Sequence, residues 1–431
     1  MQPLARIACL DLDTFFVSVE RLLHPELVGR PVVVGGHRGA RGVVLAASYE
    51  VRPFGVRSGI SLRDADRLAP KDTVFLPGTH GVYSEYAHKV RLIAQGFTPE
   101  SRVASIDEMY LDFHGCEELY RHPSDVDGDA TIERVCREMT ATIKRELGLP
   151  SSCGIGASKT IAKVASGVAK PAGVRLVRAG DEAAFLAPLP VHKLPGIGPV
   201  GEQRLRELGI HTLGQLAGTR VDEVKSFFGV RAGDLILRAR GVVAVAGTQL
   251  GRERPAFREH DPEGETLGSI SNERTFEEDL RVPGDVEARL CALVERVCWR
   301  ARKRGVRART VTLKLRYSDF ETLTRSRTFH PTNSEIDVLP VVLDLYRKTR
   351  TRRMPVRLVG IQLSNLREPE PQLELELDAK ERLHLSVDTI RERYGFDAVG
   401  AAGARRATAR ILLDEGRWAG GRAWLRHRGD R

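Results

Sequence analysis

The chain has 431 residues, with 67 Lys and Arg against 57 Asp and Glu, and its net charge is +10. The composition, 42% hydrophobic and 29% charged, is that of a folded globular protein and excludes wholesale disorder. No stretch approaches the ~18 consecutive apolar residues of a membrane helix, and acidic residues interrupt the N-terminal apolar run, which argues against a secretory signal. Six cysteines without a CxxC pair indicate reduced thiols and a cytoplasmic location. The positive charge favours a polyanionic partner.

The first 150 residues mix strands and helices without a regular βαβ alternation. In chain order, the patterns predict a strand over 6–12, a helix over 15–23, strands over 31–34 and 42–47, a strand or hairpin over 101–113 and a helix over 128–148. This mixture favours an α+β fold over a doubly wound sheet.

The rest of the chain changes character three times. Residues from about 160 to 240 have a helical pattern, and the charged, Gly-rich residues after 242 indicate a linker that ends at about 266. A second α+β unit over 267–366 follows, with strands predicted over 310–317 and 356–364. The Arg-, Ala- and Gly-rich end is expected to be poorly ordered.

Carboxylates at predicted strand ends are the first candidates for chemistry. Asp11 lies at the end of the first strand, and the adjacent Asp107 and Glu108 lie on a distant one. Hard cations such as Mg²⁺ prefer oxygen ligands, and two such ions can stabilise both the attacking and the leaving oxygen of a phosphoryl displacement. If the two strands are neighbours, the three carboxylates converge. Any one of them could equally be a solvated strand end, and Asp13 is the one that we interpret as structural.

A triphosphate also needs cationic and hydroxyl partners. Tyr49 and Arg52 lie three residues apart, and Lys170 precedes a proline that ends a helix. A phenol, a guanidinium fork and an ammonium together suit phosphate oxygens. Each residue taken alone is more often an ordinary surface group.

Five motifs together resemble those of a known family, the Y-family translesion DNA polymerases, and are most similar to its DNA polymerase IV type. They are DLDTFF, SYEVRPFGVRSGI, SIDEMYLD, GIGASKTIAKVASGVAKPAG and LPGIGPVGEQRLRELGI, in the family's order and spacing. The resemblance covers residues 5 to about 366. It implies a multidomain right-hand polymerase that adds dNTPs to a primer 3′ end on a DNA template, with low fidelity and no proofreading.

The resemblance also implies domain boundaries. Palm and fingers would occupy residues 1–170, with the fingers over about 20–76. A helical thumb would follow over 171–242, a linker over 243–266, the little finger over 267–366 and a C-terminal tail over 367–431.

Roles for single residues follow from the same resemblance. Asp11, Asp107 and Glu108 would be catalytic and would bind two Mg²⁺ ions, with the backbone carbonyl of Leu12 as a further ligand. Phe16 would be an aromatic steric gate, which leaves no room for the 2′-hydroxyl that distinguishes ribose from deoxyribose. The alternative for Phe16 is a core aromatic residue beside Phe15.

The same resemblance assigns Tyr49, Arg52 and Lys170 to the incoming nucleotide. Two departures from the family pattern bear on that site: Ala46 offers no hydroxyl there, and Met109 is bulkier than the alanine frequent at its position. We expect these two residues to alter nucleotide affinity or the shape of the site.

The glycines from Gly196 to Gly201 fit two motifs. Their spacing reads as G-x-G-x-x-G, but a dinucleotide fingerprint needs a preceding strand, and here Pro195 precedes the motif and Pro199 lies inside it. We interpret the segment as a helix-hairpin-helix turn, in which Gly196 and Gly198 let backbone N–H groups approach a DNA phosphate. A loop without a ligand remains the alternative.

A basic cluster spans residues 300–327. The alternating strand sequence places Lys314 and Arg316 on one face, and Arg325 and Arg327 follow. Charge runs are often only solvated, but an excess of one sign favours phosphate contact. In the family this unit grips the DNA duplex.

The tail contains the sequence QLELEL at residues 372–377, which resembles the short sliding-clamp-binding peptides of bacterial polymerases. Gln372 and Leu375 match, and Leu377 would replace a missing aromatic residue. The alternative is an edge strand or an acidic tail. We expect a monomer with primer–template DNA, dNTPs and the clamp as partners.

Two other functions fit parts of the chain. A catalytically silent, polymerase-like DNA-binding scaffold would not need all three carboxylates. A two-metal nuclease would have no use for Phe16, Tyr49 and Arg52 in this arrangement.

Overall fold

The computed structural model describes residues 6–98, 100–242, 268–368 and 379–400. The chain forms two compact units, residues 1–39 with 43–264, and residues 40–42 with 265–431. The linker predicted over 243–266 and the peptide at 372–377 lie outside the described residues.

The centre of the first unit is a five-stranded sheet in the order β5-β6-β1-β7-β8. Its strands are β1 (Ile7–Leu12), β5 (Glu100–Val103), β6 (Glu108–Asp112), β7 (Ser151–Gly156) and β8 (Val174–Leu176). The central strand β1 runs antiparallel to both β6 and β7. A smaller sheet joins β2 (Val32–Val34), β3 (Ala46–Ala47) and β4 (Val74–Leu76) in the order β3-β2-β4.

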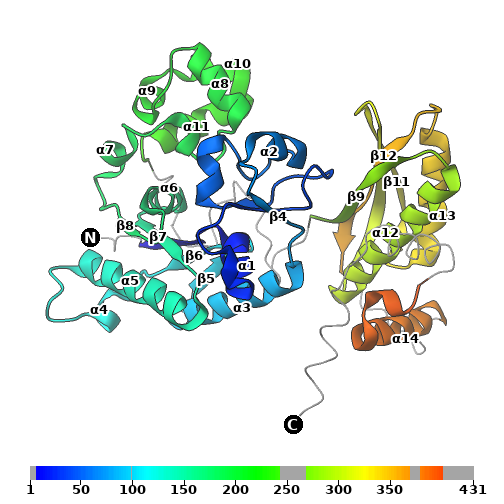
Figure 1. Ribbon diagram of the computed structural model, residues 1–431, viewed down its shortest axis with the longest axis horizontal. Helices are drawn as coiled ribbons and strands as arrows, with labels where there is room; N and C mark the ends of the chain where they lie inside the picture. The colour runs from blue at the N-terminus through cyan, green and yellow to red at the C-terminus, as the bar shows by residue number, and fades with distance from the viewer. Residues whose placement is uncertain (1–5, 99, 243–267, 369–378, 401–431) are drawn as a thin grey trace, which may run out of the picture. The chain divides into compact units, whose positions relative to one another are not determined.

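Helices cover both faces of the large sheet. α6 (Lys159–Ala169) lies on one face, and α1 (Phe15–Leu23), α3 (His80–Gln95) and α5 (Gly128–Leu147) lie on the other. α4 (Glu117–Tyr120) packs on α5, and α2 (Leu62–Leu68) and 3-10 turns at Pro25–Leu27 and Tyr49–Phe54 complete this part of the chain. The long α5 is defined at both ends by its sequence. The Asp127 carboxylate accepts a hydrogen bond from the Ala130 N–H, and Gly148 ends the helix with a φ of 71°, which favours glycine. The helix α6 packs on β1, β7 and β8 (Figure 1).

The remainder of the first unit, from Glu182 onward, is helical as its sequence predicts, but the helical pattern expected from about residue 160 is interrupted by β8, a strand of the large sheet. It contains α7 (Glu182–Leu186), α8 (Pro199–Glu207), α9 (Leu213–Gly218), α10 (Val221–Phe228) and α11 (Ala232–Ala239), with 3-10 turns at Val191–Lys193 and Gly229–Arg231. Their apolar residues form a core of their own around Leu205, Leu213 and Ile236.

The second unit is a four-stranded antiparallel sheet in the order β11-β10-β12-β9. Its elements are β9 (Ser269–Leu280), α12 (Pro283–Lys303), β10 (Arg307–Tyr317), β11 (Thr322–Thr332), α13 (Glu335–Thr349), β12 (Val356–Arg367), α14 (Ala379–Tyr394) and a 3-10 turn at Phe396–Ala398. α12 and α13 pack on one face of this sheet through a shared apolar core.

Two further sequence predictions about elements were wrong. The strand predicted over 42–47 is reduced to Ala46–Ala47, with Val43 forming only an isolated bridge to Ser61. The C-terminal end was predicted to be poorly ordered, but α14 forms within it. The charged face of α14 packs on the second unit, and a periodicity search for apolar faces does not detect such a helix.

Candidate active site

Strand alternation places two of the predicted carboxylates side by side. Asp11 on β1 is the direct register partner of Glu108 on β6, and Cα atoms of such partners lie ~4.5–5.5 Å apart. Leu10, Leu12 and Met109 point into the main core of the first unit. Side chains alternate along a strand, so Asp11 and Glu108 lie on the opposite face, which α6 covers.

Asp107 lies immediately before β6, beside the end of β1. Its carbonyl oxygen accepts a hydrogen bond from the Leu12 N–H at 2.9 Å, and its carboxylate accepts one from the Ser105 hydroxyl. The two strands are therefore neighbours, as the convergence of Asp11, Asp107 and Glu108 requires.

Two lysines from α6 and its C-terminal end face this pair of carboxylates. The Lys170 ammonium lies 2.5 Å from Asp11 Oδ1, and Lys163 forms an ion pair with Glu108. Ser158 begins α6 by accepting a hydrogen bond from the Ile161 N–H, and this cap fixes the helix that presents Lys163.

The electrostatics are those of a buried acidic cluster. Burial raises the pKa of the Asp11 carboxyl, Lys170 opposes the rise, and the negative charges of Asp107 and Glu108 add to it. Burial disfavours the charged form of Lys163, but attraction to Glu108 outweighs burial and leaves the pKa of Lys163 raised. The negative charge at this end of the sheet therefore attracts cations.

The donor set suits a hard divalent cation. Asp11, Asp107, Glu108 and the Leu12 carbonyl offer only oxygen, the ligand type that Mg²⁺ prefers. Within the described ranges, no three acidic, His or Cys side chains are gathered closely enough to form a ready metal site. Two of the carboxylates are instead paired with cations, Asp11 with Lys170 and Glu108 with Lys163.

Tyr49 and Arg52 lie together on the 3-10 turn Tyr49–Phe54. The Arg52 guanidinium lies over the Tyr49 ring, 4.4 Å from its centroid, and Arg52 is exposed. The Tyr49 hydroxyl is buried close to Asp13, and its geometry does not complete a hydrogen bond with a described residue. Burial and the negative charge of Asp13 raise the pKa of Tyr49. Lys170 lies 3.9 Å from the same Asp13, so Tyr49 and Lys170 border a common acidic centre.

Asp13 has the structural role that the sequence suggests. Its side chain is fully buried and accepts hydrogen bonds from the Ser152 hydroxyl at 2.9 and 3.1 Å and from the Ala172 N–H at 2.7 Å. These bonds connect the end of β1 to β7 and to the segment that follows Lys170.

Phe16 differs from its neighbour Phe15 in burial. Phe15 is 3% exposed within the core, whereas Phe16 is only partly buried. The Phe16 ring stacks on Tyr83 of α3, with centroids 4.3 Å apart and planes inclined by 17°. The Tyr83 hydroxyl donates a hydrogen bond to the buried Glu20. Phe16 is thus a partly open ring with a fixed aromatic support.

Met109 does not lie where it was expected to narrow the site. It is 5% exposed and packs in the main core of the first unit with Leu10, on the sheet face opposite Glu108. Its bulk is therefore accommodated by the core. Ala46 on β3 is partly buried and packs against the same core.

The glycine motif forms a turn between two helical segments. Gly196 has a φ of 98°, which only glycine adopts without strain. Gly198 is the N-cap of α8, and a Cβ added there would meet no atom within 4 Å, so its backbone is open. No strand directly precedes the motif in the described chain, which excludes the dinucleotide fingerprint.

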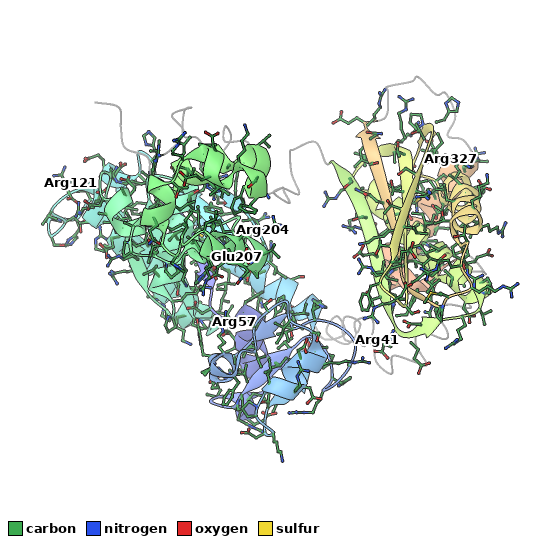
Figure 2. All side chains as sticks on the ribbon, turned by 90° about the horizontal axis from the view of Figure 1, so that it is seen from above. Arg41, Arg57, Arg121, Arg204, Glu207 and Arg327 are labelled. Atoms are coloured by element: carbon green, nitrogen blue, oxygen red, sulfur yellow. The ribbon has the colours of Figure 1, made fainter. Side chains whose placement is uncertain are left out.

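The four basic residues of the second unit divide between two faces of the sheet. Lys314 and Arg316 alternate with the core residues Leu313 and Leu315 of β10, so they lie on the face without helices. Arg325 and Arg327 on β11 pair in register with Leu313 and Val311, and so take the other face. Arg327 forms an ion pair with Asp344 of α13 at 2.6 Å. Figure 2 labels Arg327 on the second unit. The structure therefore does not bring all four residues together.

The open face carries two cations, several hydroxyl groups and one carboxylate, Glu273 of β9, which forms an ion pair with Lys314 at 2.6 Å. In the register, Lys314 and Arg316 lie opposite Thr324 and Thr322. Further members of this face are Thr312, Ser326, Ser271 and Ser364. Hydroxyl groups and cations are the usual contacts for a phosphate backbone.

Sequence reasoning missed two residues that border the site, Lys163 and Tyr83. Lys163 lies seven residues before Lys170 in a helical pattern, a spacing that places both on one helix face and could have indicated it. The residues around Tyr83 in the sequence do not indicate its role, because that role is a contact with Phe16, and the two residues lie on different helices, α3 and α1.

Comparison with known proteins agrees with this geometry. Residues 10–167 match the impB/mucB/samB family, residues 268–377 match its C-terminal domain, and residues 179–210 match the helix-hairpin-helix motif of the family. The DNA polymerase IV of Dehalococcoides mccartyi is 40% identical over 398 residues, which cover 91% of this chain and 96% of the relative. The DNA polymerase IV of Moorella thermoacetica is 35% identical over 90% of this chain and 93% of the relative.

The chain belongs to the Y family of DNA polymerases. A solved Y-family DNA polymerase chimera shares the fold, with a TM-score of 0.70 and 24% identity over 84% of this chain and 100% of that one. The Y-family assignment and the α+β polymerase fold expected from the sequence are thereby confirmed.

Membership of the Y family makes the chain a template-directed, translesion DNA polymerase, and it disfavours the catalytically silent scaffold. Divalent metal dependence is general in this family. None of the described helices combines the length and apolar character needed to cross a membrane.

Proposed function

We propose that Asp11, Asp107 and Glu108 are the catalytic carboxylates and that they hold two Mg²⁺ ions per active site. The observation that supports this most strongly is the direct pairing of Asp11 with Glu108 across β1 and β6, with Asp107 hydrogen-bonded to Leu12. The Leu12 carbonyl is the further ligand. Bound there, the ions supply the Lewis acidity that the primer 3′-hydroxyl and the departing pyrophosphate need.

The protein's own groups orient the incoming dNTP. Lys170 and Arg52 contribute positive charge, and the buried Tyr49 hydroxyl contributes a hydrogen-bond donor without a described partner. The three suit phosphate oxygens, Arg52 as a bidentate fork and Lys170 as a point charge. Phe16 lies against the sugar and leaves no room for a 2′-hydroxyl, so it selects deoxyribose. The stacked ring of Tyr83 holds the Phe16 ring in this position.

The DNA partner is held through its phosphates. Gly198 exposes backbone at the N-terminus of α8, where the helix dipole favours anions, and Gly196 makes the turn that leads to it. On the second unit, Lys314 and Arg316 on the hydroxyl-rich face contact the duplex backbone. Arg325 and Arg327 lie on the other face and contribute through the general positive field.

The domain arrangement follows from these roles. Palm and fingers occupy residues 1–170, the thumb 171–242 and the little finger 267–366.

The polymerase acts as a cytoplasmic monomer. Gln372, Leu375 and Leu377 bind the sliding clamp, and deleting 372–377 would abolish clamp-stimulated synthesis while sparing basal synthesis.

Primer extension tests the carboxylate assignment. The wild-type chain should extend a primer on an undamaged template with dNTPs and Mg²⁺, and the Asp107→Ala, Glu108→Ala variant should not. Asp112→Asn is the matched control, because Asp112 lies at the other end of the same strand and is the register partner of Ile7. Extension by the double variant at the wild-type rate would reject the assignment.

A further inference from the structure

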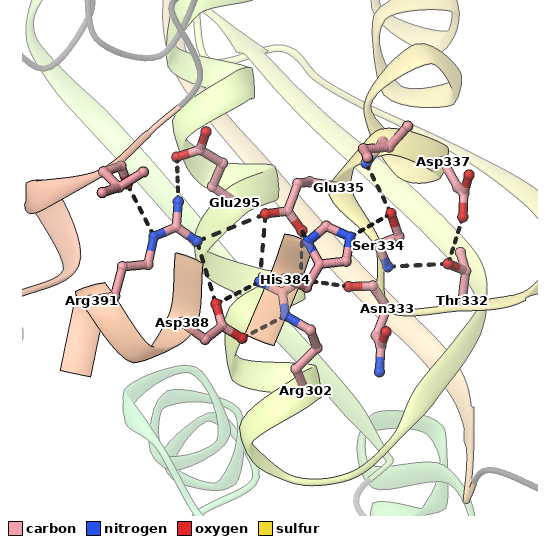
Figure 3. Close-up of polar contacts among 12 residues, drawn as sticks. Glu295, Arg302, Thr332, Asn333, Ser334, Glu335, Asp337, His384, Asp388 and Arg391 are labelled. Carbon is pink, nitrogen blue, oxygen red and sulfur yellow. Dashed lines mark hydrogen bonds and ion pairs between the residues drawn. The ribbon is translucent and has the colours of Figure 1, made fainter. Parts of the chain in front are cut away.

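The C-terminal helix α14 has an unusual orientation on the second unit. His384, Asp388 and Arg391 recur at helical spacing and face the body of the unit. The Arg391 side chain is 1% exposed and lies 3.1 Å from Glu295 of α12 and within 3.8 Å of Glu335 and Asp388 (Figure 3). The face of α14 that is buried is therefore charged.

Further ion pairs hold the helix in this orientation. Arg302 of α12 bridges Asp388 of α14 at 2.7 Å and Glu335 of α13 at 2.5 Å. His384 lies 2.9 Å from the Ser334 hydroxyl. Since buried charges need several partners in defined geometry, this network fixes the rotation of α14 about its axis.

Four apolar residues of α14 form a stripe that flanks the network, about 100° around the helix from it. Leu383, Val387, Ile390 and Tyr394 follow the spacing i, i+4, i+7, i+11, which places them in one stripe along the helix. Leu383 is 51% exposed, Ile390 39% and Tyr394 56%, and none of the four belongs to the core of the second unit. We call these four residues the α14 stripe.

The orientation needs an explanation, because burying apolar side chains is the more favourable choice. Apolar burial stabilises by ~25 cal/mol per Å², whereas desolvating ions is costly. A helix free to rotate would bury the stripe and expose the charges. The ion network prevents this rotation and leaves the stripe available to another surface.

We propose that residues 401–431 of the same chain cover the α14 stripe. The described chain ends at Gly400, which adjoins Glu295, the ion-pair partner of Arg391, so the segment starts at the side of α14. With four extended residues and a helix from Ala404 to Ile411, the segment from Gly400 reaches ~24 Å, and the 16 residues of α14 also span ~24 Å. Every part of the stripe is within reach.

The sequence of the segment suits this role. Ala404, Ala407 and Ile411 follow the spacing i, i+3, i+7, which predicts an apolar helix face. Small alanines would accept the large side chains of the stripe. Four side chains are also too few for the ~800 Å² per partner of a stable interface between separate chains. A covalently attached segment needs less area, because its effective concentration is in the mM range.

Hydrogen–deuterium exchange of residues 379–394 tests the proposal on the full chain and on a chain that ends at Gly400. We expect exchange about fivefold faster or more in the shorter chain. In the full-length chain, Ile390→Glu in the stripe and Ile411→Asp in the segment should produce the same increase. Thr389→Glu is the matched control, because Thr389 is exposed beside the stripe, and it should leave exchange unchanged.

Primer extension at the wild-type rate shows that each variant is folded, because none of these residues belongs to the polymerase site. Equal exchange in the full and the shortened chain overturns the proposal. It is also overturned if exchange slows as protein concentration rises, because a second copy would then cover the stripe.

Discussion

The Phe16 ring stacks on Tyr83 at 4.3 Å, and the Tyr83 hydroxyl is anchored to the buried Glu20 carboxylate. Phe16 is in the first turn of α1 and Tyr83 is on α3. The ring that we assign to sugar selection is therefore positioned by a contact between two helices, and its position depends on Tyr83.

Replacing this support should relax sugar selection. In Tyr83→Leu the Phe16 ring loses its stacking partner and gains room to move, so we expect more rNTP incorporation than in the wild type, and less than in Phe16→Ala. The ratio of kcat/KM for a dNTP and its rNTP measures this. Tyr86→Leu on the same helix is the control. If Phe16→Ala leaves the ratio of kcat/KM for dNTP and rNTP unchanged, Phe16 does not select the sugar and is only a core residue.

The two faces of the second sheet should respond differently when charge is removed. Each phosphate contact contributes ~0.9 to the slope of log K against log salt concentration. Lys314→Ala with Arg316→Ala should weaken DNA binding and reduce this slope by about 2. Arg327→Ala should change it less, because Arg327 lies on the face of the sheet that α13 covers, whereas Lys314 and Arg316 lie on the open face. Equal changes in slope would contradict the assignment of faces.

Asp13 should contribute to stability. Asp13→Ala leaves the Ser152 hydroxyl and the Ala172 N–H without their acceptor, which costs about 1–3 kcal/mol in the free energy of unfolding. Urea unfolding measures the loss. Glu146→Ala, at an exposed position, should stay within about 0.5 kcal/mol of the wild type. A stable Asp13→Ala protein would argue against this role.

The docking of α14 should weaken in acid. Burial lowers the pKa of His384, and the charge of Arg302 adds to the decrease, whereas Glu335, Asp388 and Asp337 oppose it. The folded state therefore favours neutral His384, while the unfolded chain takes up the proton at its ordinary pKa of ~6.5. This contribution to stability is present above pH 6.5 and is lost as the pH falls through the lowered pKa.

Denaturant unfolding at pH 7.5 and 5.5 measures this effect. His384→Gln does not titrate, so it should lose less stability between the two pH values than the wild type. His330→Gln, at an exposed position, should behave like the wild type. If His384→Gln loses as much unfolding free energy between pH 7.5 and 5.5 as the wild type does, groups other than His384 cause the loss of stability in acid.

The sequence predicts a helix or strand best where the pattern of apolar and polar residues lies within one continuous segment. The helix predicted over 15–23 is α1, and the predicted hairpin is β5 with β6. Alternation places Asp11 and Glu108 on one face of the sheet only because β1 and β6 are neighbours, which the sequence gives only as a condition. The same alternation turns Met109, next to Glu108 on the same strand, into the core.

Contacts between distant elements were not predictable. The support of Phe16 by Tyr83 and the ion pair of Lys163 with Glu108 depend on which helices pack together, and α14 depends on acceptors supplied by α12 and α13. The division of Lys314 and Arg327 between two faces follows from the register of β10 with β11. A single strand sequence does not contain that register.

Counting bound metal ions tests the central claim most directly. Mn²⁺ occupies the same oxygen sites as Mg²⁺ and can be counted by electron paramagnetic resonance. With a dideoxy-terminated primer–template and the matching dNTP, the wild type should bind two ions per active site. The Asp107→Ala, Glu108→Ala variant should lose at least one of them, while Asp112→Asn keeps both. If the double variant retains both ions, these carboxylates do not hold the metals.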